Sequence, residues 1–306
     1  MSFAHSVKKE VNVTEYSLDE VKAFLHGYIL LKGEITIANK QVSLIFRSTS
    51  LQITKTVIQA LKQAYGIDIG ISKVTKSKLN KQSQYIITIT DEARDVLSDL
   101  HLSDDGYFLN DYVSKEFDEN SAKVITGMFL AKGSINDPSK LYYHLEIVAP
   151  TTEIASYLVD RLDELGISAH IISRTKGEVV YIKRSEDIGD FLKLIGTNQE
   201  LFNFENERIK KDYNNYINRI INCDMANGVR SQETISRQLE AIKEIEDTIG
   251  FATLSTRLME GVILRTKYPT YSLQELSEVS EETVGRYIPK STLCHIMQDL
   301  EKLVNN

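Results

Sequence analysis

Two stretches of this chain share one pattern of glycine, apolar residues and lysine. Residues 24–35 read FLHGYILLKGEI, and residues 125–135 read ITGMFLAKGSI. In both, four mostly bulky apolar residues separate a first glycine from a Lys-Gly pair, and these first glycines are Gly27 and Gly127. Solenoid repeats have periods of about 20–50 residues. A spacing of one hundred residues therefore predicts a duplicated domain.

The segments that follow the two stretches also share their order. Each stretch is followed by an apolar strand-like run, a helix-like segment, and a basic hairpin that leads into a further strand. In the first copy these segments are residues 41–47, 49–66 and 72–90. In the second copy they are residues 141–150, 151–166 and 168–184. The sequence thus predicts an α+β fold with a duplicated αββαββ domain over residues 1–200, its repeats at about 18–100 and 118–200.

Alternation of apolar and polar positions in these strands predicts a sheet with one buried face. Apolar residues occupy every second position of residues 42–46, 85–89 and 179–181, which is the period of a half-buried antiparallel sheet. One face would pack on helices, and the other would be free to bind a partner.

Gly27 and Gly127 lie inside predicted helices, where glycine costs about 1 kcal/mol relative to alanine. A costly residue at the same place in both copies indicates that two helix backbones approach closely there. We therefore expect the helices to cross at these glycines, around a pseudo-twofold axis within one chain. Residues 1 to about 17 are a polar lead-in, and Ser17 and Glu20 have the capping-box spacing that should start the first helix.

Residues 201–228 are rich in asparagine and predict a helical linker, either an ordinary connecting helix or one whose amides bind a partner. Asn227-Gly228 is expected to break this helix before an all-α domain at 229–306. The helices predicted there are residues 232–248, 254–266, 272–279 and 290–304. The last two fit a helix-turn-helix DNA-binding domain. A plain helical bundle fits equally well, because the connection at 280–289 exceeds the usual turn of about 3–4 residues.

Composition sets bounds on the class of protein. The chain has 306 residues, of which 42% are hydrophobic and 26% charged, as in ordinary globular proteins. No apolar run approaches the ~18 residues of a membrane span, and the first residues lack the apolar core of a signal peptide. We therefore expect a cytoplasmic protein without membrane contact. Cys223 and Cys294 lack metal-ligand spacing and are expected to be free thiols.

The net charge of −7 argues mildly against nucleic-acid binding, unless basic residues gather on particular elements. They do gather at the predicted hairpins of both copies. A single hairpin of this kind is often merely solvated, but its recurrence favours a basic groove along the duplicated sheet. The candidate phosphate contacts on the hairpins are Lys73, Lys76, Lys78, Lys81, Arg174, Lys176, Lys183 and Arg184. Those on the linker are Arg208, Lys210, Lys211 and Arg219.

Residues 25–33 (LHGYILLKG) and 125–133 (ITGMFLAKG) resemble the motif of the LAGLIDADG homing endonucleases. The resemblance implies two motif helices packed at a pseudo-twofold axis over a saddle-shaped DNA-binding sheet. Together with FENERIKKDYNNYINRIINCDMAN at 204–227 and QLEAIKEI at 238–245, essentially the whole chain resembles the WhiA family of bacterial regulators. In that family a degenerate LAGLIDADG domain is joined to a C-terminal helix-turn-helix domain.

Lys32 and Lys132 depart from the nuclease motif. Active relatives carry an acid at this eighth motif position in each helix, and the two carboxylates hold divalent metal beside the scissile phosphates. An ammonium has no lone pair to offer Mg²⁺, which takes oxygen ligands, so metal-dependent cleavage is not expected. The two lysines would either neutralise a phosphate or simply favour the negative C-terminal ends of their helices. We expect no cofactor and no metal site, because no glycine-rich phosphate loop, nucleophile motif or His/Cys cluster is present.

The sequence therefore predicts a non-enzymatic protein that binds double-stranded DNA. The resemblance implies a nucleoid-associated transcriptional regulator, or a factor in cell division and chromosome segregation, with sporulation in some relatives. Candidate groove contacts on the last helix are Lys290, Ser291, Thr292 and His295, although fewer basic residues follow them than in WhiA-like proteins. The alternative is a protein-interaction module that binds a protein partner through its C-terminal helices. A metal-dependent endonuclease is the third and weakest hypothesis.

Overall fold

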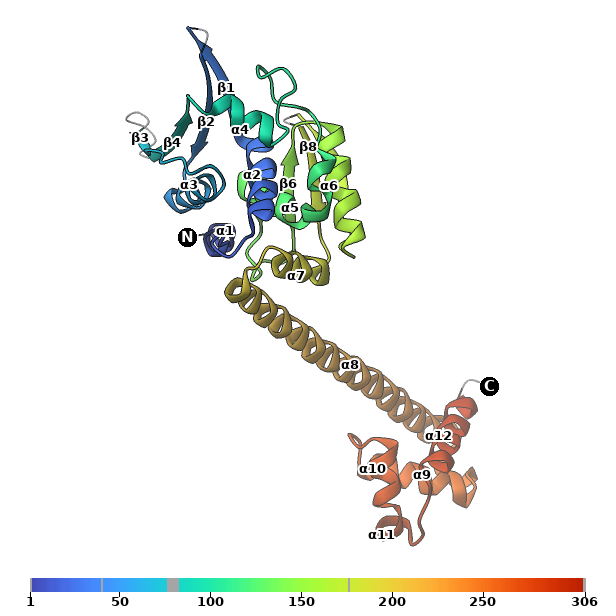
Figure 1. The fold of residues 1–306 in the computed structure, drawn as a ribbon. Helices are drawn as coiled ribbons and strands as arrows, with labels where there is room; N and C mark the ends of the chain where they lie inside the picture. The colour runs from blue at the N-terminus through green and yellow to red at the C-terminus, as the bar shows by residue number, and fades with distance from the viewer. Residues whose placement is uncertain (1, 40, 76–82, 176, 305–306) are drawn as a thin grey trace. The chain divides into compact units, whose positions relative to one another are not determined.

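The computed structural model describes residues 2–39, 41–75, 83–175 and 177–304. Its residue contacts divide the chain into two units, Met1–Lys211 and Asp212–Asn306, and each is described by itself. The elements carry the labels of Figure 1.

The first unit contains two copies of one αββαββ motif. The first copy comprises α2 (Leu18–Lys32), β1 (Gly33–Ala38), β2 (Gln41–Ser48), α3 (Leu51–Tyr65), β3 (Ser72–Thr75) and β4 (Ser83–Ile89). The second comprises α5 (Ser121–Lys132), β5 (Gly133–Ile135), β6 (Leu145–Ala149), α6 (Thr152–Glu164), β7 (His170–Arg174) and β8 (Gly177–Ile182). The predicted duplication and the α+β class are confirmed.

Each copy forms its own antiparallel sheet of four strands, in the orders β1-β2-β4-β3 and β5-β6-β8-β7. The helices α2 and α5 lie side by side between the two sheets (Figure 1). A short helix follows the last strand of each copy, α4 (Ala93–Asp99) in the first and α7 (Ser185–Leu194) in the second, and a 3-10 helix (Lys115–Asn120) leads into α5. The identical strand orders place equivalent residues of the two copies in equivalent positions.

Helix α2 is buried on all sides. It begins at the predicted capping box, in which the Ser17 hydroxyl accepts from the N–H of Glu20 and the Glu20 carboxylate accepts from the N–H of Ser17 at 2.9 Å. Every residue from Ala23 to Leu31 is buried. A helix surrounded in this way needs no polar stripe, and this explains why apolar residues run continuously through the motif.

The contact between α2 and α5 depends on Gly27 and Gly127. A Cβ atom added to Gly27 would lie 2.1 Å from the carbonyl oxygen of Val124, and one added to Gly127 would lie 2.1 Å from that of Phe24. Both neighbours are backbone atoms, which no change of side-chain rotamer can move. Only glycine fits at either position, and the predicted crossing of the two helices is confirmed.

Strand register assigns the side chains of each sheet to two faces. In the second sheet Glu146 pairs with Tyr181, and Tyr181 pairs with His170, so these three residues share the outer face. The core face carries Leu145, Ile147, Val180 and Ile182. The alternation at residues 179–181 was expected to mark the buried face, and this expectation is wrong. Four consecutive apolar residues, 179–182, make the alternation in β8 ambiguous. In the structure Val180 and Ile182, rather than Val179 and Tyr181, face the core.

The N-terminal helix α1 (Phe3–Glu10) packs on the first unit, although the sequence predicted only a polar lead-in there. Its Val7 is fully buried in the core. The Lys8 ammonium donates to the carbonyl oxygen of Leu130 at 3.1 Å, close to the end of α5. Helix α1 thus reaches the point where the second motif helix ends.

Glu10 connects α1 to the start of α8 (Asn198–Thr248). Its two carboxylate oxygens accept from the N–H groups of Gln199 and Glu200, at 2.6 and 3.0 Å. Backbone N–H groups in the first turn of a helix have no partner within the helix, and an acid there also favours the positive end of the helix dipole. Glu10 therefore serves as the N-terminal cap of α8 from a distant part of the chain.

Helix α8 is continuous over 51 residues, including Asn227 and Gly228. The predicted break at Asn227-Gly228 is therefore wrong. Gly228 does not adopt a left-handed conformation, and no described atom beyond its own turn of the helix backbone lies within 4 Å of the place where its Cβ would be. One glycine in a helix interior costs about 1 kcal/mol, which the adjoining turns of a long helix outweigh.

The second unit continues with α9 (Thr256–Lys267), α10 (Leu273–Glu278), α11 (Ser280–Val284) and α12 (Lys290–Val304). The ends of α9, α10 and α12 lie within two residues of those predicted, and α10 begins at the predicted capping box of Ser272 and Glu275. Helix α11 was not predicted. It occupies the connection that the sequence indicated was too long for a tight turn.

Two buried serines fix the path from α10 to α12. The Ser277 hydroxyl donates to the carbonyl oxygen of Ile288 at 2.7 Å, and the Ser280 hydroxyl accepts from the N–H of Ile288 at 2.8 Å. Gly285 ends α11 in the left-handed region at φ 80°. The connection is therefore a defined structure that places the N-terminus of α12.

Gly27→Ala is expected to destabilise the first unit, because the added methyl group would meet the Val124 carbonyl and separate α2 from α5. Overpacking of this kind costs about 1–3 kcal/mol, occasionally more. Gly228→Ala is the matched control, also a glycine in a helix, and is expected to stabilise the protein by about 0.5–1 kcal/mol. Urea unfolding followed by circular dichroism measures both. A Gly27→Ala protein as stable as the wild type would contradict the backbone contact.

His26 is expected to make stability fall on acidification. The side chain is fully buried, its Nδ1–H donates to the Leu100 carbonyl at 2.7 Å, and burial lowers its pKa from 6.5 to about 4. Between these values the unfolded chain binds a proton that the folded chain excludes, so stability is lost as pH falls, by up to about 1.4 kcal/mol per pH unit. His26→Gln should flatten this dependence in thermal melts from pH 7 to 4. The exposed His170→Gln should leave it unchanged.

Candidate nucleic-acid interface

The outer face of the second sheet carries rings beside a cation. The Tyr181 ring centroid lies 5.9 Å from that of His144 and 5.6 Å from that of His170. The Lys183 ammonium lies 4.8 Å from the centroid of the Tyr181 ring, a cation–π contact. This contact leaves its N–H groups able to donate hydrogen bonds. Lys183, one of the predicted phosphate contacts, is thus held on the outer face and has no ion-pair partner among the residues that the structure describes.

The two predicted arginines near this face differ in their environment. Arg174 shares the outer face, where its Nη1 lies 3.3 Å from the Glu146 carboxylate. Arg184 precedes α7, 3.7 Å from the Asp187 carboxylate, and its side chain is 68% exposed. Both charges are partly offset by an acid, so Lys183 is the strongest candidate of the three.

The first sheet presents fewer of the predicted cations. Lys73 pairs with Tyr85 and so belongs to the helix-facing side, although its place on the edge strand β3 leaves it exposed. Arg47, which was not predicted, lies on the outer face and forms an ion pair with Glu34. Lys76, Lys78, Lys81 and Lys176 lie outside the described residues.

The predicted linker cations in the first unit already have partners within the protein. Arg208 pairs with Glu186 and Glu205, Lys210 pairs with Glu207, and Lys211 donates to the Lys140 carbonyl and lies 4.5 Å from the Tyr143 ring. Arg219, in the second unit, is exposed. The charges of the described linker cations in the first unit are therefore partly offset within the protein.

Helix α12 separates an apolar face from a polar one. Leu293, Ile296, Met297 and Leu300 are buried at helical spacing. Ser291, His295, Gln298 and Lys302 recur every three or four residues on the opposite side, and all four are exposed. Lys290 is the exposed first residue of the helix, while Thr292 is half-buried at the border of the polar face. The predicted groove contacts thus lie mainly on one accessible surface of α12.

A basic pocket of about 350 Å³ adjoins the start of α12. Its wall includes Lys290, Arg230 of α8, Arg265 of α9 and the N-cap Ser272 of α10. Arg265 is only 1% exposed, and its guanidinium donates to the Gln238 side chain and the Tyr271 carbonyl, which fix its position. Lys290 and Arg230 of this pocket are exposed, and neither forms an ion pair within the described ranges.

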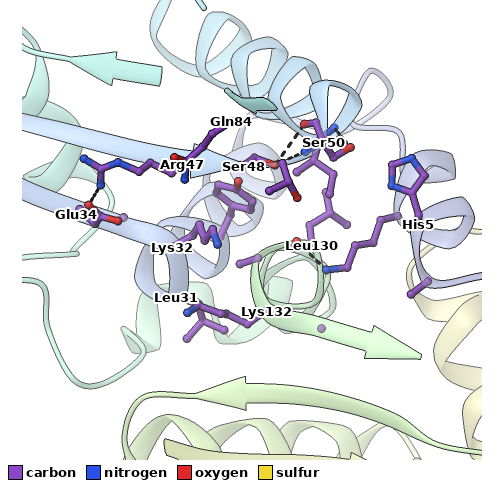
Figure 2. Close-up of a pocket in the computed structure, with 18 of the residues that line it drawn as sticks. His5, Leu31, Lys32, Glu34, Arg47, Ser48, Ser50, Gln84, Leu130 and Lys132 are labelled. Carbon is purple, nitrogen blue, oxygen red and sulfur yellow. Dashed lines mark hydrogen bonds and ion pairs between the residues drawn. The ribbon is translucent and has the colours of Figure 1, made fainter. Parts of the chain in front are cut away.

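A second cavity, of about 570 Å³, lies where the two motif helices end (Figure 2). Lys32 and Lys132, the last residues of α2 and α5, both line it, together with Lys8 from α1. Figure 2 shows Lys32 and Lys132 at the two helix ends, Ser48 at the end of β2 and Ser50 just before α3. The crossing at the glycines therefore gathers like charges from both copies at one place.

Burial, together with proximity of like charges, lowers the pKa values of Lys8 and Lys32. Burial and the neighbouring charge of Lys32 lower the pKa of Lys8 to about 8. Burial and the charge of Lys132 lower the pKa of Lys32 as well. None of the three lysines forms an ion pair with a carboxylate within the described part of the chain. The cavity is consequently a site of uncompensated positive charge.

The cavity does not suit a divalent metal. Glu34 is the one carboxylate among the described residues that line it, and Glu34 is engaged by Arg47. Across the described ranges, no cluster of three or more His, Cys, Asp or Glu could hold a metal ion. The positions that would supply metal oxygens in a homing endonuclease carry ammonium groups here, and these repel a cation.

Lys8, Arg47 and Arg230 belong to these sites but were not predicted. Arg47 lies two residues after Ile45 and four after Ser43 in β2, so all three point to the same face of the sheet. The strand period alone could therefore have predicted its outer position. Lys8 contacts Leu130 near the end of α5, 122 residues later in the sequence, and no local sequence pattern predicts a contact of this kind. Arg230 meets Lys290 only because α8 continues past Gly228, where the sequence indicated a break.

Three family models match consecutive parts of the chain. They are the WhiA N-terminal LAGLIDADG-like domain at residues 19–103, the WhiA LAGLIDADG-like domain at 121–214, and the WhiA C-terminal HTH domain at 217–304. A protein of Lysinibacillus sphaericus named "Probable cell division protein WhiA" is 34% identical over 309 residues, covering 100% of this chain and 97% of that relative. The chain belongs to the WhiA family.

Further comparisons agree with WhiA membership. A relative of the same name from Enterococcus faecalis is 34% identical and aligns over 91% of this chain and 90% of its own length. The crystal structure of full-length DUF199/WhiA from Thermotoga maritima covers 100% of this chain with a TM-score of 0.58 and 22% identity, a likeness of fold. The helix-turn-helix interpretation of the last helices is confirmed over a plain bundle by the WhiA HTH model.

No helix in the described part of this WhiA-family chain is both long and apolar enough to span a membrane.

Lys32→Met is expected to raise the pKa of Lys8 from about 8 toward the ordinary 10.5, because it removes a positive charge that disfavours protonation. NMR titration of protein labelled at the lysine ε-carbons resolves this shift. Lys9→Met, which changes an exposed neighbour in the sequence, is the control and should leave the Lys8 titration in place. A wild-type Lys8 that titrates near 10.5 would contradict the crowding of ammonium groups.

Proposed function

We propose that this WhiA-family protein binds double-stranded DNA without cleaving it and regulates genes of cell division. The observation that carries the proposal is the helix-turn-helix domain at 217–304, whose last helix keeps its polar face exposed. A recognition helix of this class reads bases with residues near its N-terminus. Ser291 and His295 lie there, and Lys290 and Arg230 stand beside them as phosphate contacts. The names of the relatives, which refer to cell division, support the biological role.

The duplicated domain would contribute affinity rather than sequence recognition. Lys183 and Arg174 lie on the outer sheet face, from which they would contact phosphates without reading bases. Among the described residues few other cations on this face are free of acids, so we expect a modest contribution. Roles in transcription and in chromosome segregation follow as inferences from DNA binding combined with the cell-division names of the relatives.

Cleavage is not part of the proposal because of the chemistry at Lys32 and Lys132. Two ammonium groups would not hold the metal on which homing endonucleases depend, and the nearby Glu34 is paired with Arg47. The same two lysines would attract a phosphate, so the site favours anion binding over phosphodiester hydrolysis.

A protein-interaction module is a second candidate, supported by one specific observation. Tyr213, Tyr216 and Ile220 of α8 lie on one helix face and are 64%, 62% and 41% exposed. Exposed aromatic residues in a row are typical of surfaces that bind protein. Association driven by such a surface would depend little on salt, whereas binding to DNA phosphates depends on it steeply.

Binding of the full chain to a random 30-base-pair duplex should weaken linearly on a log–log plot against salt, with a slope of about −0.9 for each phosphate contact. Lys290→Gln is expected to reduce affinity about fivefold and the magnitude of the slope by about one. Lys183→Gln should produce a similar or smaller effect. Fluorescence anisotropy at several salt concentrations measures both quantities.

Lys115→Gln is the matched control, since Lys115 is exposed and lines none of the pockets described above. It makes the same change of net charge and should leave DNA affinity within about twofold. Binding that is absent at low salt, or equal loss of affinity in the Lys115 and Lys290 variants, would refute the proposal.

A further inference from the structure

The cavity at the ends of α2 and α5 has a charge that the helix-turn-helix does not use. Lys8, Lys32 and Lys132 come from three different helices, and no described carboxylate pairs with any of them. Holding like charges together opposes folding unless something offsets their repulsion. Such an arrangement is typical of an anion-binding site.

We propose that this cavity binds the phosphate group of a small molecule. Lys32 and Lys132 would contact the phosphate from the two helix ends, and Lys8 would contact it from α1. Lys8 donates one hydrogen bond to Leu130, which aims its ammonium while leaving two donors for a ligand. Bonds between an ammonium and a phosphate oxygen are charge-assisted and are among the strongest hydrogen bonds in proteins.

The lining of the cavity offers further polar partners. Ser48 ends β2, Ser50 is the N-cap residue of α3, and Gln84 of β4 lines the same cavity. Tyr28 of α2 also lines the cavity. Ligand pockets commonly measure about 300–1,000 Å³. A cavity of about 570 Å³ therefore has room for a phosphate joined to an organic part of sugar or nucleoside size.

Stabilisation of helix ends accounts for the position of each lysine singly but not for their convergence on one cavity. A lysine at the C-terminal end of its own helix is favoured by the helix dipole, and this explains Lys32 and Lys132 singly. Lys8 likewise donates to the Leu130 carbonyl in the last turn of α5. Stabilisation of helix ends does not require, however, that three cations without a described carboxylate partner face one cavity. The proposed anion accounts for all of them with one interaction.

Helix α1 favours a small ligand over a DNA backbone. Ser2, Ala4, His5 and Lys8 form part of the cavity wall, so α1 lies along one side of the space that a phosphate would enter. Val7 is fully buried, and Glu10 is hydrogen bonded to α8, which together fix α1 in place. A duplex would have to reach past this helix, whereas a small molecule would not.

Isothermal titration of the full chain with inorganic phosphate, at constant ionic strength maintained with chloride, tests the proposal. Saturable binding to one site is expected. Lys32→Met/Lys132→Met should weaken it at least tenfold, because two charge-assisted contacts are lost while side-chain length is kept. Lys115→Met is the control and should bind phosphate as the wild type does. Equal phosphate affinity in the double variant and the control, or no binding above the chloride background, would overturn the proposal.

A DNA arm separates the two sources of phosphate. Duplex DNA should bind the double variant within about twofold of its wild-type affinity, and saturating inorganic phosphate should not displace it beyond the effect of equal ionic strength. A loss of DNA affinity that parallels the loss of phosphate affinity would show that the cavity is a DNA contact, and the small-ligand proposal would fail. Failure of DNA binding itself would leave the phosphate titration unaffected.

A second measurement guards against misfolding of the double variant. Lys132 is exposed, so Lys132→Met alone should fold and still weaken phosphate binding about threefold or more. In the wild-type protein, bound phosphate should raise the pKa of Lys8 above its value of about 8, because an anion favours the ammonium form. A Lys8 titration that does not respond to phosphate would overturn the assignment of Lys8 to the site.

Discussion

The contact of two peptide backbones at Gly27 and Gly127 sets the architecture of the first unit. Each glycine leaves room for the carbonyl of the other helix, so the two copies can approach closely enough to share one core. The sheets lie on either side of this pair (Figure 1), and the outer sheet faces are oriented by it. Helix termini, strand starts and the cavity between them all take their positions from this crossing.

The pseudo-twofold axis brings the last residues of the two motif helices close together, so the side chain at this position occurs twice in one site. With two acids, the pair would hold a cation against repulsion between carboxylates. With Lys32 and Lys132, the sign is reversed, and the same geometry concentrates positive charge. The fold is insensitive to this exchange because the lysines lie at helix ends, beyond the buried segment that ends at Leu31. A change of chemistry was therefore possible without a change of structure.

The elements governed by local patterns could be predicted from the sequence, and those governed by distant contacts could not. The close approach of the helices at Gly27 and Gly127 could be predicted because a residue that is unfavourable in helices recurs at the same place in both copies. Gly228 predicted a break in the helix, but α8 continues through it, because the adjoining turns outweigh the cost of one glycine, about 1 kcal/mol. The sequence predicted that Lys32 and Lys132 lie at the ends of the motif helices and that Lys290 begins the last helix, and these positions agree with the structure, while their part in binding stays a prediction. The position of Lys8 was not predicted, since its contact with Leu130 joins residues far apart in sequence.

Because Glu10 caps the N-terminus of α8, the first ten residues stabilise a helix that begins almost 190 residues later in the sequence. They shield the first turn of the helix whose later residues belong to the helix-turn-helix unit. A shortened chain that began at the capping box of α2 would expose unpaired N–H groups at that turn and uncover the apolar surface under Val7. In this protein the N-terminal segment is thus an integral layer of the core, and truncation there is a change to the domain itself.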